Sequence, residues 1–462
     1  MIPPLFLERM EQLLGDAYPA FLASYENVHD QALRFNPLKG ERAAFEKKCT
    51  FALSPVPWAE NGYYYGMQDQ PGKHPYHEAG VYYIQEPSAM APAAYLDAQP
   101  GEKILDLCAA PGGKSTQIAA AMRGEGLLVS NEIHPARAKI LSENMERMGV
   151  TNAMVTNESP QALANVFTEY FDRIMVDAPC SGEGMFRKNE LAGEQWSPET
   201  VRMCAKRQLE ILGCAAQMLR PGGRMVYSTC TFAPEENEGT VSRFLEQYPQ
   251  FHIVPVKRYE GMSAGVAEWV NDPAEGIAHT IRLFPHLLRG EGHFVAVLEK
   301  EGTVSEHYEG YCANGLEKPL AKGESKAYLA ELEDIVQMPL PQRLIRFGDQ
   351  LYLIPDPMPA TKRLRVLRPG LHVGTIKKNR LEPAHALALA IRPEDARHRW
   401  DLPLDGSAGG NPEQIRAYLA GETFPAEGEK GWYIISVDGY SVGWGKLAGT
   451  VMKNHYPKGL RK

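Results

Sequence analysis

The sequence predicts an α/β protein built on a doubly wound, mostly parallel sheet, with an N-terminal α/β extension and small β-rich C-terminal modules. From residue 101 to about residue 300, short apolar runs alternate with helical patterns, which is typical of a parallel sheet with helices on both faces. Residues 1–95 mix helical patterns with an aromatic stretch rich in Pro and Gly, whereas 343–384 and 410–462 consist of short strand-like runs. A length of 462 residues suits about two to four domains.

Five apolar runs are the predicted strands of the sheet: KILDLCA, GLLVSNE, AMVT, RIMVDAP and RMVYSTC. Helices are expected over residues 113–124, 135–148 and 198–219, because Pro or Gly marks their ends. Another helix is expected after Pro234, with Glu235 and Glu236 in its first turn, where the helix dipole favours acids. The segments HTIRLFPH and HFVAVLEK, joined by LLRGEG, predict a closing antiparallel hairpin.

These elements predict four domains. They are an N-terminal extension (1–95), the central α/β domain (96–300), a linker with a first C-terminal module (301–385) and a last module (386–462). The polar stretch 301–340 predicts the linker plus a helix, and a Gly-rich break is expected at 405–410.

The composition is that of a globular protein, with 44% hydrophobic and 23% charged residues. No apolar run reaches the roughly 18 residues that predict a transmembrane helix. The start, MIPPLFLERMEQLLG, lacks the basic segment and long apolar core of a secretory signal. Seven widely spread Cys, an odd number, argue for a reducing cytoplasm rather than a disulfide framework. We therefore expect a cytoplasmic protein, acting as a monomer, with no membrane partner.

The net charge of −8 conceals a basic C-terminal third. Residues 341–382 hold nine Lys or Arg against three acids, and residues 446–462 hold five bases and no acid. This local excess predicts contact with a polyanion such as nucleic acid. The alternative is that both segments are ordinary solvated surfaces.

A glycine-rich turn follows the first predicted strand. The segment KILDLCAAPGGKSTQIAAA places Asp106 at the strand end and Gly112 and Gly113 before a helix, where a ligand can approach the backbone. The turn matches neither G-x-G-x-x-G nor G-x-x-x-x-G-K-[ST], which disfavours a nicotinamide-dependent dehydrogenase and a nucleoside triphosphate. Glu132, twenty residues past Gly112, is placed to accept hydrogen bonds from ribose hydroxyls. The favoured ligand is S-adenosylmethionine, and the alternative is an ordinary strand-to-helix turn.

Two cysteines follow predicted strands at the same edge of the sheet. RIMVDAPCSGEG places Asp177 and Cys180 after one strand, and RMVYSTCT places Cys230 after another. A parallel sheet brings both loops beside the glycine-rich turn. The alternative is that Cys180 and Cys230 are small buried hydrophobic residues. That role is expected of four other cysteines, Cys49, Cys204, Cys214 and Cys312. No metal is expected, because the chain has no C-x-x-C pair and the isolated His74 and His77 suit a structural or RNA-facing role.

Three motifs, DLCAAPGGKS, DAPCSGEG and STCT, resemble in their order the Nop/Sun family of RNA (cytosine-carbon-5) methyltransferases. The resemblance extends upstream through ALRFNPLK and GVYYIQEPSAM and downstream through GWGKLAG and KNHYPKGLR, so it covers nearly the whole chain. The N-terminal segment and the C-terminal modules are most similar to the bacterial RsmF-type branch. Members of that branch modify 16S ribosomal RNA and carry two small C-terminal domains, the last one PUA-like, for RNA binding.

The resemblance implies a class I, Rossmann-like methyltransferase core with S-adenosylmethionine as cofactor. The residues that would hold the cofactor are Cys108, Ala109, Ala110, Pro111, Gly112, Gly113, Lys114, Glu132 and Asp177. The family often has an Asp near the adenine, and either Glu158 or Ser159 matches that place here. Cys230 matches the nucleophile and Cys180 the second cysteine, which assists product release.

The implied chemistry explains the need for these groups. Carbon 5 of cytosine is a poor nucleophile, and attack of a Cys230 thiolate on carbon 6 would turn it into an enamine carbon. Lys114 would favour the thiolate, and Asp177, if protonated or sharing a proton, would bind ring nitrogen 3 and the exocyclic amine. The same chemistry on transfer RNA and a non-catalytic ribosome assembly factor are the alternatives. Aromatic candidates for stacking on RNA bases, rather than packing in small cores, are Tyr63, Tyr64, Tyr65, Trp432, Trp444 and Tyr456.

Overall fold

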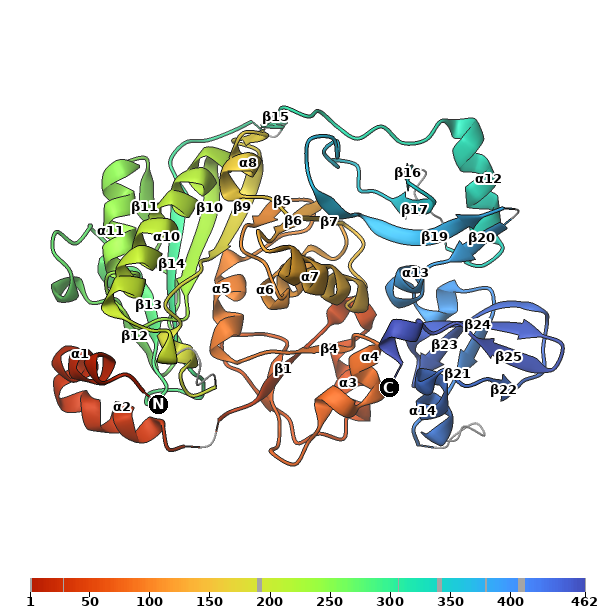
Figure 1. The fold of residues 1–462 in the computed structure, drawn as a ribbon, viewed down its shortest axis with the longest axis horizontal. Coiled ribbons are helices and arrows are strands. Elements are labelled where there is room, and N and C mark those ends of the chain that lie inside the picture. The colour runs from red at the N-terminus through yellow and green to blue at the C-terminus, as the bar shows by residue number, and fades with distance from the viewer. Residues whose placement is uncertain are drawn as a thin grey trace.

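The computed structural model describes residues 2–27, 29–188, 193–305, 307–338, 343–378, 380–405 and 412–461. The central α/β domain carries the N-terminal elements along one end, and the C-terminal modules lie on the side of α7 and α4 (Figure 1). The predicted Gly-rich break at 405–410 falls almost entirely on residues 406–411, which lie outside the described residues.

A ten-stranded sheet forms the centre, in the order β12-β13-β14-β10-β9-β5-β6-β7-β18, with β11 paired to β14. Its parallel strands are β5 (Lys103–Asp106), β6 (Leu127–Asn131), β7 (Ala153–Thr156), β9 (Phe171–Asp177) and β10 (Leu219–Thr229). Antiparallel pairings add β11 (Phe251–Ile253), β12 (Met262–Ala264), β13 (Ile281–Leu283), β14 (His293–Lys300) and β18 (Val366–Pro369). The five predicted strands and the closing hairpin are therefore confirmed, and so is the doubly wound, mostly parallel sheet.

Helices cover both faces of this sheet. One face packs against α5 (Ala91–Leu96), α6 (Gly113–Met122) and α7 (Pro135–Arg147), and the other against α8 (Pro160–Ala164), α10 (Pro198–Met218) and α11 (Glu238–Gln247). The start of α10 is set locally, because the Ser197 side chain accepts a hydrogen bond from the backbone N–H of Thr200. None of the helices in the described part of the chain is long and apolar enough to cross a bilayer.

One helix start was predicted wrongly. α11 begins at Glu238, so Glu235 and Glu236 precede it in a turn instead of forming its first turn. The reason is tertiary: the carboxyl group of Glu236 is bound by Ser181, which lies on the loop after β9.

The N-terminal extension has its own four-stranded sheet, in the order β2-β3-β1-β4. Its elements are α1 (Pro4–Leu14), α2 (Tyr18–Ser24), β1 (Ala32–Phe35), α3 (Arg42–Lys48), β2 (Ser54–Pro55), β3 (Gly62–Tyr64), α4 (Pro75–Glu78) and β4 (Tyr82–Ile84). Short 3-10 turns along the chain include Pro37–Lys39, Ser88–Met90, Glu183–Met185, Ala267–Trp269, Ile277–His279 and Pro393–Asp395.

The C-terminal part forms two further sheets, of the orders β16-β17-β19-β20 and β21-β23-β24-β25-β22. Its first elements are β15 (Tyr311–Cys312), which pairs with β8 (Phe167–Thr168), α12 (Lys322–Glu333), β16 (Leu344–Phe347), β17 (Gln350–Leu353), β19 (Leu371–Lys377) and β20 (Arg380–Pro383). The remaining ones are α13 (His385–Ala390), β21 (Arg399–Asp401), α14 (Pro412–Ala420), β22 (Phe424–Pro425), β23 (Gly431–Val437), β24 (Tyr440–Ala448) and β25 (Val451–Asn454). The predicted β-rich modules and the helix within the linker are confirmed.

The modules share hydrophobic cores with one another. One core joins Phe35 and Phe45 of the N-terminal extension to Tyr433 and Tyr440 of the last module. A second joins residues 332–396 to Ile434 and Trp444. The strand β18 also leaves its own module and extends the central sheet by pairing with β7. The four domain boundaries drawn from the sequence stay predictions, and the modules on either side of them are tightly packed.

The Tyr76–Asp438 hydrogen bond provides a test of this packing. The buried hydroxyl of Tyr76 donates to Asp438 Oδ2 at 2.6 Å, across the contact between the N-terminal extension and the last module. Tyr76→Phe leaves that oxygen without its donor and should lower the free energy of unfolding by about 1–3 kcal/mol. Denaturant unfolding measures the change, and Tyr311→Phe, at an exposed tyrosine, is the matched control. Equal stability of both variants would contradict a shared core.

Candidate active site

A hollow of about 220 Å³ lies beside the glycine-rich turn between β5 and α6. Its lining from the central domain is Cys108, Ala109, Ala110, Pro111, Gly113, Lys114 and Asp177, all of them predicted site residues. Gly112 does not line it but shapes the turn, with φ at +116°. A Cβ there would lie 3.3 Å from the Leu141 side chain, so the backbone conformation and the packing both favour glycine.

The N-terminal extension contributes the other wall of this hollow, which sequence reasoning missed. The residues are Tyr83, Ile84, Gln85, Glu86 and Ala89. All five lie within the motif GVYYIQEPSAM, which carries part of the family resemblance. Arg34 fixes this wall, because its guanidinium donates to Gln85 Oε1 at 3.1 Å and to the Gly113 carbonyl at 3.0 Å.

Asp106 is fully buried at the end of β5, next to this turn. Its Oδ2 accepts a hydrogen bond from Ser115 Oγ at 2.7 Å, whereas Oδ1 has no partner among the described residues. Burial raises the pKa of Asp106 to about 7, although the Ser115 hydrogen bond opposes this. A buried, incompletely satisfied carboxyl group at a strand end suits a polar ligand.

Glu132 and Ser159 do not line the hollow. The buried carboxylate of Glu132, just after β6, accepts from the backbone N–H of His134 at 2.8 Å and lies 3.4 Å from Arg137. The Ser159 hydroxyl caps α8, and the Glu158 carboxylate accepts from the backbone N–H of Arg365 at 2.7 Å. Both side chains after β7 are thus engaged within the protein, and their roles toward an adenine stay predictions.

Lys114 and Asp177 form an ion pair inside the hollow, with Nζ and Oδ2 2.8 Å apart. Asp177 Oδ1 also accepts from Ser228 Oγ at 2.7 Å. Burial alone would raise the pKa of Asp177, but Lys114 and the other donors outweigh it and lower the pKa below its ordinary value. These contacts favour the ionised form of Asp177 over a protonated or proton-sharing one.

The sulfur atoms of Cys180 and Cys230 lie 3.3 Å apart. The two residues follow β9 and β10, which are parallel neighbours, so the same edge of the sheet presents both thiols. Both side chains are half-buried, and neither forms a disulfide. The predicted approach of residues 50 positions apart in the chain is confirmed.

The Glu236 side chain links the loop that carries Cys180 to the loop that carries Cys230. Its Oε2 accepts from the backbone N–H of Ser181 at 3.0 Å and from Gln208 Nε2 at 2.7 Å, and Ser181 Oγ donates to Oε1 at 2.5 Å. Ser181 and Thr231, which directly follow the two cysteines, are joined by a 2.8 Å hydrogen bond. The sequence did not identify Glu236 as a positioning group, because an acid that follows Pro234 is typical of the first turn of a helix.

The surroundings of Cys180 favour its protonated thiol. The hydrogen bond to Cys230, followed by burial, raises the pKa of the Cys180 thiol well above its ordinary value. Lys114 is close enough for an electrostatic interaction with a Cys230 thiolate. The arrangement can therefore hold one thiolate between a neighbouring S–H donor and a cation, which is the setting of a nucleophilic cysteine.

The structural roles expected of the other residues are confirmed only in part, because Cys49 and Cys312 are half-buried instead of buried. Cys204 and Cys214 are buried on α10, and His74 caps α4 by accepting from the backbone N–H of Tyr76. No group of three or more potential metal ligands was found within the described ranges. Four of the aromatic candidates are buried, which favours packing: Tyr63, Tyr64, Trp444 and Tyr456. Tyr65 and Trp432 are half-exposed.

Several bases of the predicted basic surface form ion pairs within the protein. Carboxylates pair with four of the nine bases in residues 341–382, namely Arg343, Arg365, Arg368 and Arg380. Arg363, Lys377 and Lys378 are exposed, as are Lys453 and Lys458 of the tail. Lys462 lies outside the described residues. Arg365 and Arg368 connect the module to the central domain, and contact of the other bases with a polyanion stays a prediction.

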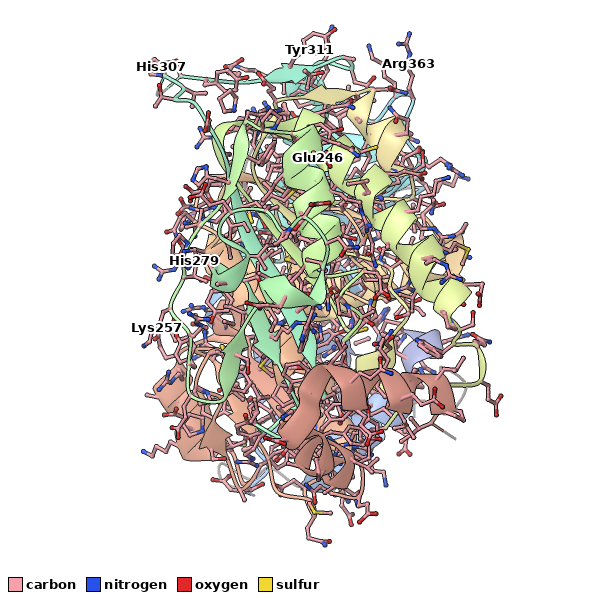
Figure 2. The ribbon with its side chains drawn as sticks, turned by 90° about the vertical axis from the view of Figure 1, so that its left-hand side faces the viewer. Glu246, Lys257, His279, His307, Tyr311 and Arg363 are labelled. Carbon is pink, nitrogen blue, oxygen red and sulfur yellow. The ribbon has the colours of Figure 1, made fainter. Side chains whose placement is uncertain are left out.

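A larger hollow lies elsewhere. It measures about 1330 Å³ and is lined by α11, α1 and residues 269–279. Glu246 and His279, two of its lining residues, mark this face in Figure 2. None of the predicted site residues lines it, so its size does not make it the chemical site.

Two solved structures show which class of protein this fold and site define. A methyltransferase homologue protein from Pyrococcus horikoshii covers 64% of this chain and 94% of its own, at a TM-score of 0.58 and 30% identity. NSun6 from Pyrococcus horikoshii with SFG covers 65% of this chain and 99% of its own, at a TM-score of 0.56 and 21% identity, and shows the common fold. The central domain is a Rossmann-like methyltransferase domain.

Family profiles account for most of the chain. The profile of the 16S rRNA methyltransferase RsmB/F matches residues 93–299, and the RsmF N-terminal, first C-terminal and PUA domains match residues 2–87, 328–391 and 410–462. A ribosomal RNA small subunit methyltransferase F from Erwinia tasmaniensis is 31% identical over 99% of this chain and 96% of its own. That of Vibrio campbellii is 32% identical over 99% and 97%. The chain belongs to the RsmB/F family of 16S rRNA methyltransferases.

The pH dependence of the free energy of unfolding tests whether burial raises the pKa of Glu236. Burial raises the pKa of this fully buried group from 4.5 to about 7. A raised acid pKa stabilises the fold below about pH 4.5, and the stabilisation is lost as the pH rises through 7, a change of about 3 kcal/mol. Glu236→Gln does not titrate and should lack this loss.

Urea unfolding of the wild type and Glu236→Gln between pH 4.5 and 8 measures the difference. The exposed neighbour Glu235 provides the matched control, Glu235→Gln, which should keep the wild-type profile. If the Glu236→Gln curve instead ran parallel to that of the wild type, the raised pKa would be wrong.

Proposed function

We propose that this protein transfers a methyl group from S-adenosylmethionine to carbon 5 of a cytidine in 16S ribosomal RNA. The observation that carries the proposal is the 3.3 Å approach of the Cys180 and Cys230 sulfur atoms at the sheet edge that also holds the Lys114–Asp177 pair. Membership of the RsmB/F family supports ribosomal RNA as the substrate.

The residues around the glycine-rich turn fit the cofactor. The unpartnered Asp106 Oδ1, the open turn at Gly112 and the acidic Glu132 after the next strand suit a nucleoside with a charged amino-acid tail. We assign its binding to residues 108–114, with Glu132, Asp177 and Ser159 as further contacts. When bound, S-adenosylmethionine supplies the electrophilic methyl group.

Cys230 is the proposed nucleophile. Its thiolate attacks carbon 6 of the cytosine, a carbon–sulfur bond forms, and the electron pair of the 5,6 double bond becomes available at carbon 5. Cys180 keeps its own proton and donates a hydrogen bond to the Cys230 sulfur before attack. A thiol donor at this distance favours a thiolate over a second neutral thiol.

Lys114 and Asp177 hold the base while the charge develops. The ionised Asp177 accepts a hydrogen bond from the exocyclic amine of the cytosine, and Lys114 places a positive charge beside the ring. Their mutual pairing keeps both side chains in place without substrate, which is electrostatic preorganisation.

Cys180 acts again at product release. As the carbon–sulfur bond to carbon 6 breaks, the sulfur of Cys230 recovers a negative charge, and the S–H of Cys180 stabilises it as a leaving group. We place this work in the cytoplasm, with the enzyme as a monomer and with the exposed bases of the C-terminal modules on RNA phosphates.

Covalent trapping tests the two thiols. Cys230→Ala should abolish methyl transfer, because no carbon–sulfur bond can form. Cys180→Ala should transfer methyl groups but accumulate the Cys230–RNA adduct, which migrates as a shifted band on a denaturing gel. Cys204→Ala, at a buried cysteine on α10, is the control and should behave as wild type. Full activity of Cys230→Ala would overturn the assignment of the nucleophile.

The same assay separates the alternative substrates. Purified small subunits, free 16S ribosomal RNA and total transfer RNA are offered with a labelled methyl donor. Label in transfer RNA alone would favour the alternative substrate, and no label in any RNA would favour a non-catalytic assembly factor.

Charge reversal tests the RNA surface. Lys377→Glu with Lys378→Glu, at the exposed end of β19, should weaken RNA binding about tenfold at low salt and reduce its salt dependence. Cofactor affinity should not change. Lys257→Glu with Arg258→Glu, at two exposed bases of which Lys257 is labelled in Figure 2, is the matched control and should leave RNA affinity unchanged. Equal loss in both double variants would contradict a localised RNA surface.

A further inference from the structure

A chain of three buried polar side chains leads from the N-terminal extension to the active site. The Glu86 carboxylate accepts a short hydrogen bond from Ser88 Oγ, and His293 Nδ1 lies 3.0 Å from the same hydroxyl oxygen. Ser88 is fully buried, and His293 is 6% exposed. The proposed mechanism uses none of these three groups.

The hydrogen bonds determine which nitrogen of His293 carries the proton. The Glu86 carboxylate also accepts from the backbone N–H groups of Ser88, Ala89 and Glu291, which favour its ionised form. An ionised carboxylate can only accept, so Ser88 must donate its single proton to it. Ser88 Oγ can then only accept from His293, which therefore donates Nδ1–H. The lone pair of the neutral ring is then on Nε2.

His293 lies beside the nucleophilic cysteine. It begins β14, and the next residue, Phe294, pairs with Thr229, the residue before Cys230. The carbonyl oxygens of Cys230 and Gly292 each lie 3.0 Å from the Cβ position of Gly184, so both chain segments meet at one point.

His293 also shares a side of the sheet with the group that binds Asp177. Side chains alternate along a strand, and Val295, two residues on from His293, pairs with Ser228. Ser228 Oγ donates to Asp177 Oδ1. His293 therefore belongs to the same side as the Lys114–Asp177 pair.

The charges around His293 keep it neutral. Burial, followed by the nearby Lys114 cation, lowers its pKa below the ordinary value, and the carboxylates of Glu86 and Asp177 only partly oppose this. The imidazole therefore presents a free base at neutral pH. Cys180, whose thiol retains its proton, does not.

We propose that His293 is the general base that removes the proton from carbon 5 after methyl transfer, directly or through one water molecule. His293 Nε2 takes the proton, the electrons of the C5–H bond re-form the 5,6 double bond, and the C6–S bond breaks. The electron pair of the C6–S bond returns to the Cys230 sulfur, which the Cys180 S–H stabilises. The His293 imidazolium then passes its proton to solvent. The Glu86–Ser88 pair orients the ring and stabilises its positive charge, as a carboxylate does for a catalytic histidine.

This inference rests on the proposed function, and a double-label experiment separates the two. RNA with tritium at carbon 5 of cytidine and a radiolabelled methyl donor report proton removal and methyl transfer independently. His293→Asn keeps a donor at the place of Nδ1 but has no Nε2. It should transfer the first methyl group at nearly the wild-type rate, release tritium about a hundredfold more slowly and accumulate the covalent adduct.

Chemical rescue distinguishes a base from a structural residue. Added imidazole should restore tritium release to His293→Ala but not to Cys180→Ala, because only the former lacks a base. Ser88→Ala, which frees the ring, should slow release several-fold without changing RNA affinity. His372→Asn, at a half-buried histidine of β19, is the matched control and should behave as wild type.

The outcomes are separable. A wild-type enzyme that neither methylates RNA nor forms an adduct would refute the proposed function itself. With an active wild type, tritium release at the wild-type rate from His293→Asn would overturn the assignment of the base. Equal loss of methyl transfer and tritium release in both His293 variants, without rescue by imidazole, would also overturn it.

Discussion

The close approach of two sulfur atoms depends on one buried carboxyl group. Glu236 is bound by the backbone and hydroxyl of Ser181 and by the amide of Gln208 on α10. Separating the cysteine loops would leave this carboxyl group buried without its donors, which costs several kcal/mol. The 3.3 Å distance between Cys180 and Cys230 is thus maintained by a polar contact outside the reacting groups.

That distance also decides how the thiols share their protons. Two thiolates at 3.3 Å would repel each other strongly, so only one of the pair can ionise. The shared hydrogen bond and burial raise the pKa of the Cys180 thiol, and Lys114 is the cation near the pair. The asymmetry of the two roles therefore follows from the surroundings of two chemically identical side chains.

The C-terminal modules are fixed relative to this site. The strand β18 extends the central sheet, and Arg365 and Arg368 pair with Glu158 and Glu146 of the central domain. A shared core joins the last module to the N-terminal extension, which itself lines the hollow at the glycine-rich turn. The modules that present the exposed bases thus lie at a defined position relative to the thiols.

The amino-acid sequence by itself determined the strands, most helix limits, the glycine-rich turn and the placing of Cys180 and Cys230 at one edge. These follow from apolar alternation, Pro and Gly positions and the geometry of a parallel sheet, which are all local or general rules. Only the tertiary structure decided that Glu236 leaves its expected helix, that Arg368 docks a module and that His293 stands beside Cys230. Each of these depends on a partner tens to hundreds of positions away in the chain. No local sequence pattern determines the free energy of such a pairing.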